Sequence, residues 1–332
     1  MRQIIEQKIN STAYNFLSSE PDLQNTIYLV ASGSLGYGTH NENSDLDLRG
    51  ILIEPEQYLY GLHTFDQFEN KKYDTVIYGL KKFFRLALQG NPNILELLGI
   101  EAAGVIKCAK SGYWIRENVD IFLSRAVINS FGNYAVSQLR RLQNALARDS
   151  YPQEKKEEHI LNTLNNLQDH FKNRYTHFES GKIELYPADS IKTEFEQEIF
   201  MNIHLQHYPL RDFIAIYSEM KDIVRSYDKL SSRNRKKDDP HLYKHAMHLI
   251  RLLITGIDIL EGKGVITYRQ KEQSLLLAIR NGELSFEEIF ALFEQYQERF
   301  QYAAKHTALP EKPDEKRAEK LMCEIYLSQE HY

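Results

Sequence analysis

The chain has 332 residues, and its 41 lysines and arginines are outnumbered by 46 aspartates and glutamates, which gives a formal net charge of -5. There is no overall positive field to hold nucleic acid, so any polyanion must meet a local basic patch. Cys108 and Cys323 lie far apart without CxxC spacing, as in proteins of a reducing compartment. The N-terminus lacks the apolar block of a signal peptide, and no stretch reaches the roughly 20 apolar residues of a membrane span. We therefore expect a cytoplasmic protein that makes no membrane contact.

The first elements in chain order are a helix and two strands. Apolar residues at helical spacing predict an amphipathic helix over residues 1–20. Residues 26–32 (TIYLVAS) are β-branched and apolar, and they predict a buried strand that runs into a glycine-rich loop beginning at Gly33-Ser34. Residues 45–53 (DLDLRGILI) predict a second strand, with Asp45, Asp47 and Arg49 on one face.

Helices dominate the rest of the chain. A strand or strand pair is predicted over residues 65–77, broken near 70–72. A helix is then predicted over 80–87, and another that begins with Asn91 as N-cap and Pro92 in the first turn. The part with strands ends near residue 110. From Trp114 onward helical periodicity continues almost throughout, with breaks near residues 150–152, Pro187, Pro209 and 231–240.

The stretch from Gly33 to Gly50 (GSLGYGTHNENSDLDLRG) carries the clearest chemistry. A turn of Gly33 and Ser34 lets backbone N–H groups and a hydroxyl approach phosphate oxygens closely, as a triphosphate site requires. Asp45 and Asp47, two residues apart on a strand, project the same way and can share hard cations such as Mg²⁺. Two such ions would stabilise an in-line displacement at phosphorus. Chance is the competing explanation, because glycine turns are common and solvated strand faces alternate, but aspartate is a poor strand former.

This G-S turn followed by S-D-L-D-L-R-G resembles the signature of the DNA-polymerase-β-like nucleotidyltransferase superfamily. The stretches 73–84 (YDTVIYGLKKFF), 90–97 (GNPNILEL), 244–253 (KHAMHLIRLL) and 278–282 (AIRNG) are similar to a bacterial and phage group of predicted nucleotidyltransferases. The resemblance implies an α+β fold: a catalytic domain with a small mixed sheet over residues 1–110, and a helical C-terminal domain over residues 111–332 that closes the nucleotide cleft.

The resemblance also implies site residues. Gly33, Ser34 and Ser44 are expected to bind the nucleotide, and Asp45 and Asp47 to be catalytic and to bind two Mg²⁺ ions, with Mn²⁺ as an alternative. A third carboxylate normally completes such a site. We place it at Asp74, with Glu69 as the runner-up, although Asp74 also fits a turn or a helix cap.

One face of the helix predicted around residue 250 is basic. Lys244, His248 and Arg251 follow one another at i, i+4 and i+7, while the opposite positions are apolar. Such a face points either to water or to a cleft. We expect the cleft, with all three residues at the nucleotide and Lys244 on its triphosphate. Arg49 either pairs with the aspartates or holds phosphate, and the charged run 233–237 is either a solubilising hinge or a contact to substrate.

The expected reaction moves a nucleoside monophosphate from an NTP or dNTP to an acceptor hydroxyl, with release of pyrophosphate. The acceptor belongs to an oligonucleotide, a protein or a small molecule, and short oligonucleotides are one expected product; Tyr332 is a candidate primer hydroxyl. A nucleotide sensor or antitoxin-like partner without turnover is the alternative from another class. The intact D-x-D pair argues against it, since a binding module does not need two carboxylates that repel each other without metal. The apolar helical half is compatible with a homodimer.

Overall fold

The computed structural model describes residues 1–41, 44–150, 161, 181–189, 197–218, 220–221 and 239–328. The chain divides into two compact units, residues 1–139 with 239–332 and residues 140–238. The boundary expected near residue 110 falls inside the first unit, between its last strand and the next helix. The charged run 233–237 and Tyr332 lie outside the described residues.

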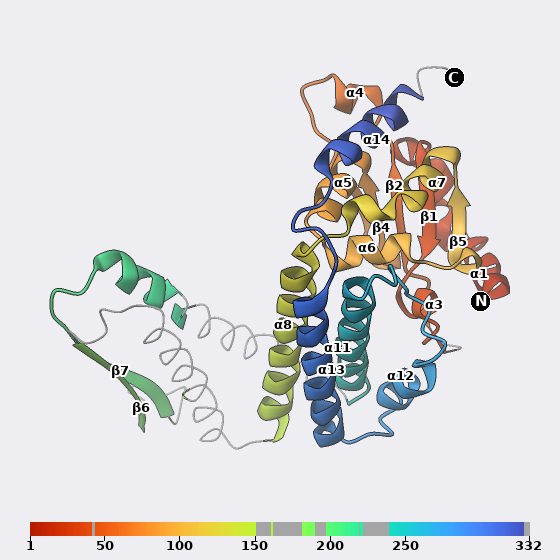
Figure 1. Ribbon diagram of the computed structural model, residues 1–332. Helices are drawn as coiled ribbons and strands as arrows, with labels where there is room; N and C mark the ends of the chain where they lie inside the picture. Colours follow the sequence, from red (N-terminus) through yellow and green to blue (C-terminus); the bar gives the residue numbers. More distant parts are fainter. Residues whose placement is uncertain are drawn as a thin grey trace. The chain divides into compact units, whose positions relative to one another are not determined.

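The first unit is built on a five-stranded mixed sheet of order β3-β4-β2-β1-β5, in which only the pair β2 and β4 is parallel (Figure 1). Its strands are β1 Thr26–Ala31, β2 Leu48–Leu52, β3 Gln67–Asn70, β4 Thr75–Gly79 and β5 Val105–Cys108. Strand β1, which lies between β2 and β5, is buried along its whole length, as its β-branched and apolar sequence predicts. The sequence therefore predicts this fold class correctly.

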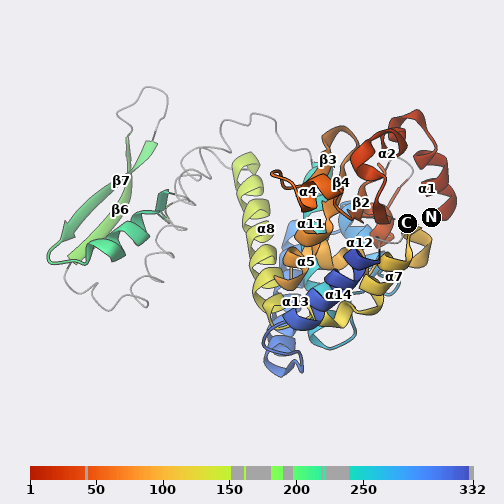
Figure 2. The same ribbon diagram turned by 90° about the horizontal axis from the view of Figure 1, so that it is seen from above.

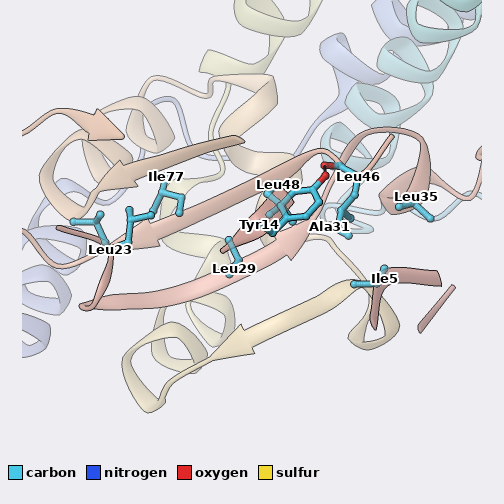
Figure 3. Close-up of a cluster of buried hydrophobic side chains, with 10 residues drawn as sticks. Ile5, Tyr14, Leu23, Leu29, Ala31, Leu35, Leu46, Leu48 and Ile77 are labelled. Carbon is cyan, nitrogen blue, oxygen red and sulfur yellow. Dashed lines mark hydrogen bonds between the residues drawn. The ribbon is translucent and has the colours of Figure 1, made fainter. Parts of the chain in front are cut away.

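Short helical segments surround the sheet. They are α1 Arg2–Ile9, η1 Thr12–Tyr14, α2 Phe16–Ser19, η2 Pro21–Leu23, α3 Gly33–Tyr37, α4 Glu56–Leu59, η3 Lys71–Tyr73, α5 Leu80–Leu88, α6 Pro92–Leu98, η4 Ala102–Gly104, α7 Lys110–Glu117 and η5 Val119–Phe122. The N-terminal segments cover one face, where Ile5, Tyr14 and Leu23 join strand residues such as Leu29 and Leu48 in one core (Figure 3). Helix α7 packs on β1, and α5 packs on β2 and β4.

Four longer helices complete the first unit: α8 Ala126–Ser150, α11 Asp239–Leu260, α13 Phe286–His306 and α14 Glu315–Leu327. The shorter helix α12, Gln273–Arg280, lies between α11 and α13 in the chain. The last residues of α8 pass the boundary of this unit, which falls after residue 139. Helices α8, α11 and α13 meet where Gly256 leaves room for Phe131 and Phe300 (Figures 1 and 2). Helix α14 packs against α5 and α7, and the Tyr326 hydroxyl donates to Glu54 Oε2 at 2.6 Å. None of the helices in the described ranges is long and apolar enough to cross a bilayer.

The second unit contains an antiparallel hairpin, β6 Gly181–Asp189 and β7 Gln197–Leu205, followed by helical residues 210–218. The expectation of helix almost throughout this region is wrong for the hairpin. Met201, Ile203 and Leu205 alternate with the polar residues Asn202 and His204 along β7, and this period of two is the strand signal that helical periodicity masked. Ile183 of β6 packs against Ile216 of the helical segment.

The N-terminal helix expected over residues 1–20 is also broken. Helix α1 ends at Ile9, and Asn10 and Ser11 turn the chain before the one-turn segment that contains Tyr14. Asparagine and serine compete with helical hydrogen bonds through their own side chains, which favours a break here. The break allows Tyr14 to enter the core beneath the sheet (Figure 3).

Candidate active site

Gly33 brings the predicted phosphate turn against Asp47. The glycine begins α3 with φ +59°, so the expected loop is in fact the first turn of a short helix. A Cβ at residue 33 would lie 1.9 Å from Asp47 Oδ2, which leaves room for no residue other than glycine. The Ser32 N–H donates to Asp47 O at 2.9 Å and fixes the two segments together. Ser34 is buried in the same turn.

Asp45 and Asp47 precede the strand rather than lying in it. The ladder of β2 begins at Leu48, three residues later than the sequence predicts, because partner strand β1 has already given way to α3. The expected alternation is nevertheless present: Leu46 is 2% exposed, Asp45 is exposed and Asp47 is half-buried. The two carboxylates therefore lie away from the core.

Tyr14 holds the peptide between these two aspartates. Its hydroxyl donates to Leu46 O at 3.0 Å inside the core. Burial raises the pKa of the Tyr14 phenol, and the charges of Asp45 and Asp47 raise it further, so both carboxylates act on the same hydroxyl. Its ring also packs on Tyr73, the neighbour of Asp74, at 5.4 Å between centroids. The sequence carries no local signal for this role, because Tyr14 lies some thirty residues before the two aspartates and meets them only in the folded chain.

Asp74 reaches the same edge of the sheet from β4. Strands β2 and β4 run parallel with Leu48 opposite Thr75, so Asp47 and Asp74 precede matching positions, and the Leu48 N–H donates to Asp74 O at 3.2 Å. Asp74 has a left-handed φ of 36°, uncommon for a residue with a side chain. Arg49 Nη2 donates to its Oδ1 at 2.8 Å. Glu69, the runner-up, is exposed on edge strand β3, opposite Val76.

The carboxyl groups of Asp47 and Asp74 interact directly. Burial first, then the charge of Asp74 and a hydrogen bond with it, raise the pKa of Asp47 to about 6, against the opposing charges of Arg49 and Lys244. Two crowded carboxylates of this kind attract a divalent cation with oxygen preference. Within the described ranges no three histidine, cysteine or acidic side chains already converge as a metal cage. The residues present fit an ion held by the Asp47 and Asp74 pair, and Asp45 is exposed two residues before Asp47.

The basic face of α11 divides into different environments. Lys244 is exposed, and it lies close enough to Asp47 for its charge to lower the pKa of that carboxyl. Burial and the neighbouring cations, Arg251 foremost, lower the pKa of His248 well below its ordinary value, which keeps this imidazole neutral. Its ring meets the edge of the Tyr37 ring at 6.3 Å.

Arg251 is placed in the core. It is 6% exposed and forms an ion pair with Glu96, itself 3% exposed. Its guanidinium stacks on the Tyr37 ring at 3.6 Å, and the Tyr37 hydroxyl donates to Glu96 Oε2 at 2.7 Å. The structure thus brings Arg251 to the helix that begins with Gly33, but with its charge already balanced by Glu96. The sequence does not predict a role for Glu96 or Tyr37. A glutamate inside an apolar helix pattern gives no sign of its ion-pair partner, which is known only from the folded structure.

Ser44 organises the chain that leads into Asp45. Its hydroxyl donates to Asn41 Oδ1 and accepts from the Asn41 N–H, both at 2.9 Å, and its carbonyl accepts from Lys8. Arg280 of α12 donates to Thr39 O and lies 3.4 Å from Ser44 Oγ. The sequence motif around residue 280 is noted above, but no role for Arg280 followed from it.

This arrangement, a mixed sheet with a glycine turn after one strand and aspartates before two parallel neighbours, defines a polymerase-β-like nucleotidyltransferase. A comparison with protein families agrees: the model of RlaP, the RNA repair pathway DNA polymerase beta family, matches residues 1–178. The chain belongs to this family, and with it to the nucleotidyltransferases of the polymerase β class. No match was found among curated proteins or among solved structures.

Proposed function

We propose that this protein transfers a nucleoside monophosphate from an NTP or dNTP to the hydroxyl end of an RNA strand, using Mg²⁺ and releasing pyrophosphate. The observation that carries this proposal is the parallel pairing of β2 with β4, which brings Asp47 and Asp74 to matching positions beside the Gly33 backbone, close enough for the charge of Asp74 to raise the pKa of Asp47. The RNA acceptor is suggested by the family description. Because the chain is acidic overall, we expect it to recognise an RNA end rather than a long duplex.

The chain's own residues have separate parts in this reaction. Asp45, Asp47 and Asp74 hold Mg²⁺, which when bound lowers the pKa of the attacking hydroxyl and neutralises charge on the leaving group. Gly33 and Ser34 present backbone and hydroxyl groups to the triphosphate, and Lys244 adds a positive charge close to Asp47. The acceptor oxygen forms its bond to the α-phosphorus while the bond to the β-phosphate oxygen breaks. The hydroxyl proton passes to solvent water, and pyrophosphate departs with the electron pair of the broken P–O bond.

The remaining predicted nucleotide contacts act by positioning in this proposal. Ser44 orders the approach to Asp45, while His248 and Arg251 support Tyr37 on α3. Neutral His248 packs beside the nucleotide turn without adding to the charge of Lys244.

The test incubates the purified protein with each α-³²P-labelled NTP and dNTP, Mg²⁺, and RNA oligonucleotides that end in either a 3′ hydroxyl or a 3′ phosphate. Products are resolved on a denaturing RNA gel and on a protein gel. We expect label on RNA with the free 3′ hydroxyl, as a single addition or a ladder, and none on the blocked strand. Label on protein alone would replace the RNA acceptor with protein nucleotidylation. Bound nucleotide without any labelled product would favour a sensor.

A further inference from the structure

The described residues between α3 and Asp45, 38–41 and 44, make few backbone hydrogen bonds. Gly38 ends α3 with φ +73°, the Thr39 N–H returns to Ser34 O at 2.9 Å, and the Ser44 N–H donates to Asn41 O at 3.1 Å. Asp45 follows directly and is exposed. A carboxylate that must hold a cation at a fixed place therefore depends on side chains from elsewhere to fix its approach.

Those side chains come from residues 268–280, about 230 residues further along the chain. The Gly38 backbone packs against the Tyr268 ring so closely that a Cβ at residue 38 would lie 2.4 Å from it. Gln273 Nε2 donates to Gly38 O at 2.7 Å. Arg280, the last residue of α12, reaches both Thr39 O and Ser44 Oγ.

Arg280 is suited to fixing two acceptors at once. Its guanidinium is planar and carries five donors in a rigid fork, so two bound oxygens are held at a set separation, which a lysine cannot do. Burial lowers the pKa of this guanidinium, and no described acidic side chain forms an ion pair with it. Arg251 and Arg49, by contrast, form ion pairs with Glu96 and Asp74, respectively.

We propose that Arg280 is a positioning residue for the metal site: by joining Thr39 to Ser44, it holds the segment that presents Asp45. The metal part of this inference rests on the proposed function, whereas the ordering of the segment does not. In this proposal the Ser44 hydroxyl accepts a hydrogen bond from Arg280. It therefore stabilises the segment before Asp45 and does not bind the nucleotide.

The experiment measures hydrogen exchange of the Thr39 and Ser44 amides by NMR in the full-length protein without metal, for the unmodified chain, Arg280→Ala, Arg280→Lys and Ser44→Ala. Arg299→Ala, on the exposed side of α13, is the matched control. We expect both amides to exchange faster in Arg280→Ala and in Arg280→Lys while the amides of β1 stay protected. Ser44→Ala also removes the two hydrogen bonds between Ser44 Oγ and Asn41, and Arg280→Ala also removes the contact with Thr39 O. In the double variant the increase in exchange should be smaller than the sum of the two single effects, because the contact between Arg280 and Ser44 is lost in both.

The second readout is Mn²⁺ binding followed by electron paramagnetic resonance. Loss of a group that orients a ligand typically weakens metal affinity 10- to 100-fold, so we expect about a tenfold weaker dissociation constant in Arg280→Ala. Unchanged exchange of Thr39 and Ser44 in Arg280→Ala would overturn the inference, whatever the protein's activity. Faster exchange in a protein that transfers no nucleotide would instead leave the positioning role standing and count against the proposed function.

Discussion

At the scale of single residues, the carboxyl of Asp47 decides how the site responds to pH. Burial and the charge of Asp74 raise its pKa to about 6, so between the ordinary carboxyl pKa and about 6 the folded protein keeps a proton that the unfolded chain releases. The stability of the metal-free protein must therefore fall as pH rises through this window. Mg²⁺ binding must displace that proton, so affinity should increase with pH up to about 6 and level off above it.

Asp47→Asn tests this directly. Without the carboxylate charge, the free energy of unfolding of the metal-free protein at pH 7.5 should rise by about 1 to 2 kcal/mol after allowance for solvent screening, and its decline with rising pH should flatten. Urea unfolding at several pH values, without and with Mg²⁺, measures both effects. Asp120→Asn, which affects an exposed ion pair with Arg317, serves as control. An Asp47→Asn protein less stable than the parent at pH 7.5 would contradict the assigned pKa shift.

Tyr14 tests the support beneath the aspartates. Tyr14→Phe keeps the ring contact with Tyr73 and removes only the donor to Leu46 O, which should cost about 1 kcal/mol of unfolding free energy. Because that carbonyl lies between Asp45 and Asp47, Mn²⁺ affinity should weaken as well. Thermal unfolding and metal titration of Tyr14→Phe and of the control Tyr58→Phe, whose ring packs on Phe65, provide the comparison. Equal metal affinity in Tyr14→Phe and the parent would show that the hydroxyl has no part in the site.

At the scale of elements, two residues on the basic face of α11 have different roles: we expect Arg251 to stabilise the fold and Lys244 to bind the nucleotide. Arg251→Ala leaves Glu96 buried without its cation, so the folded state should lose about 3 to 5 kcal/mol. Lys244→Ala removes an exposed charge that faces Asp47, and should weaken binding of a nucleoside triphosphate while leaving the unfolding free energy nearly unchanged. Thermal unfolding and titration with a fluorescent nucleotide measure the two effects. The assignment fails if Lys244→Ala binds nucleotide as tightly as the parent.

The elements also show how far sequence reasoning reaches. Strand β1 and the break between β3 and β4 can be predicted from local sequence. A buried β-branched run and a polar turn are each determined by a few consecutive residues. The placement of Asp74 beside Asp47 needed the parallel pairing of β2 with β4, which joins residues far apart in the chain. Helix α1 ended early, and hairpin β6–β7 replaced expected helix, where apolar residues satisfy both periods over short windows.

At the scale of the whole molecule, residues distant in sequence assemble the site. The glycine turn and the three aspartates come from the first 74 residues, Lys244 from α11 and Arg280 from α12, all within one compact unit. Periodicity could place Lys244 on a polar helix face, yet only the fold shows that this face lies close to Asp47 while Arg251 lies in the core. Ion pairs such as Arg251 with Glu96 cannot be derived from spacing, because they depend on packing between elements.

The most direct test of the central claim, that Asp47 and Asp74 together hold the catalytic metal ions, compares Asp74→Asn with Glu69→Gln in the labelled-nucleotide assay on RNA with a free 3′ hydroxyl. Both positions are acidic and lie near the same edge of the sheet, but Asp74, unlike Glu69, is among the groups that shift the pKa of Asp47. We predict that Asp74→Asn abolishes transfer, as Asp47→Asn does, while Glu69→Gln keeps it close to that of the parent. Full transfer by a folded Asp74→Asn protein, or loss of transfer in Glu69→Gln alone, would contradict the account.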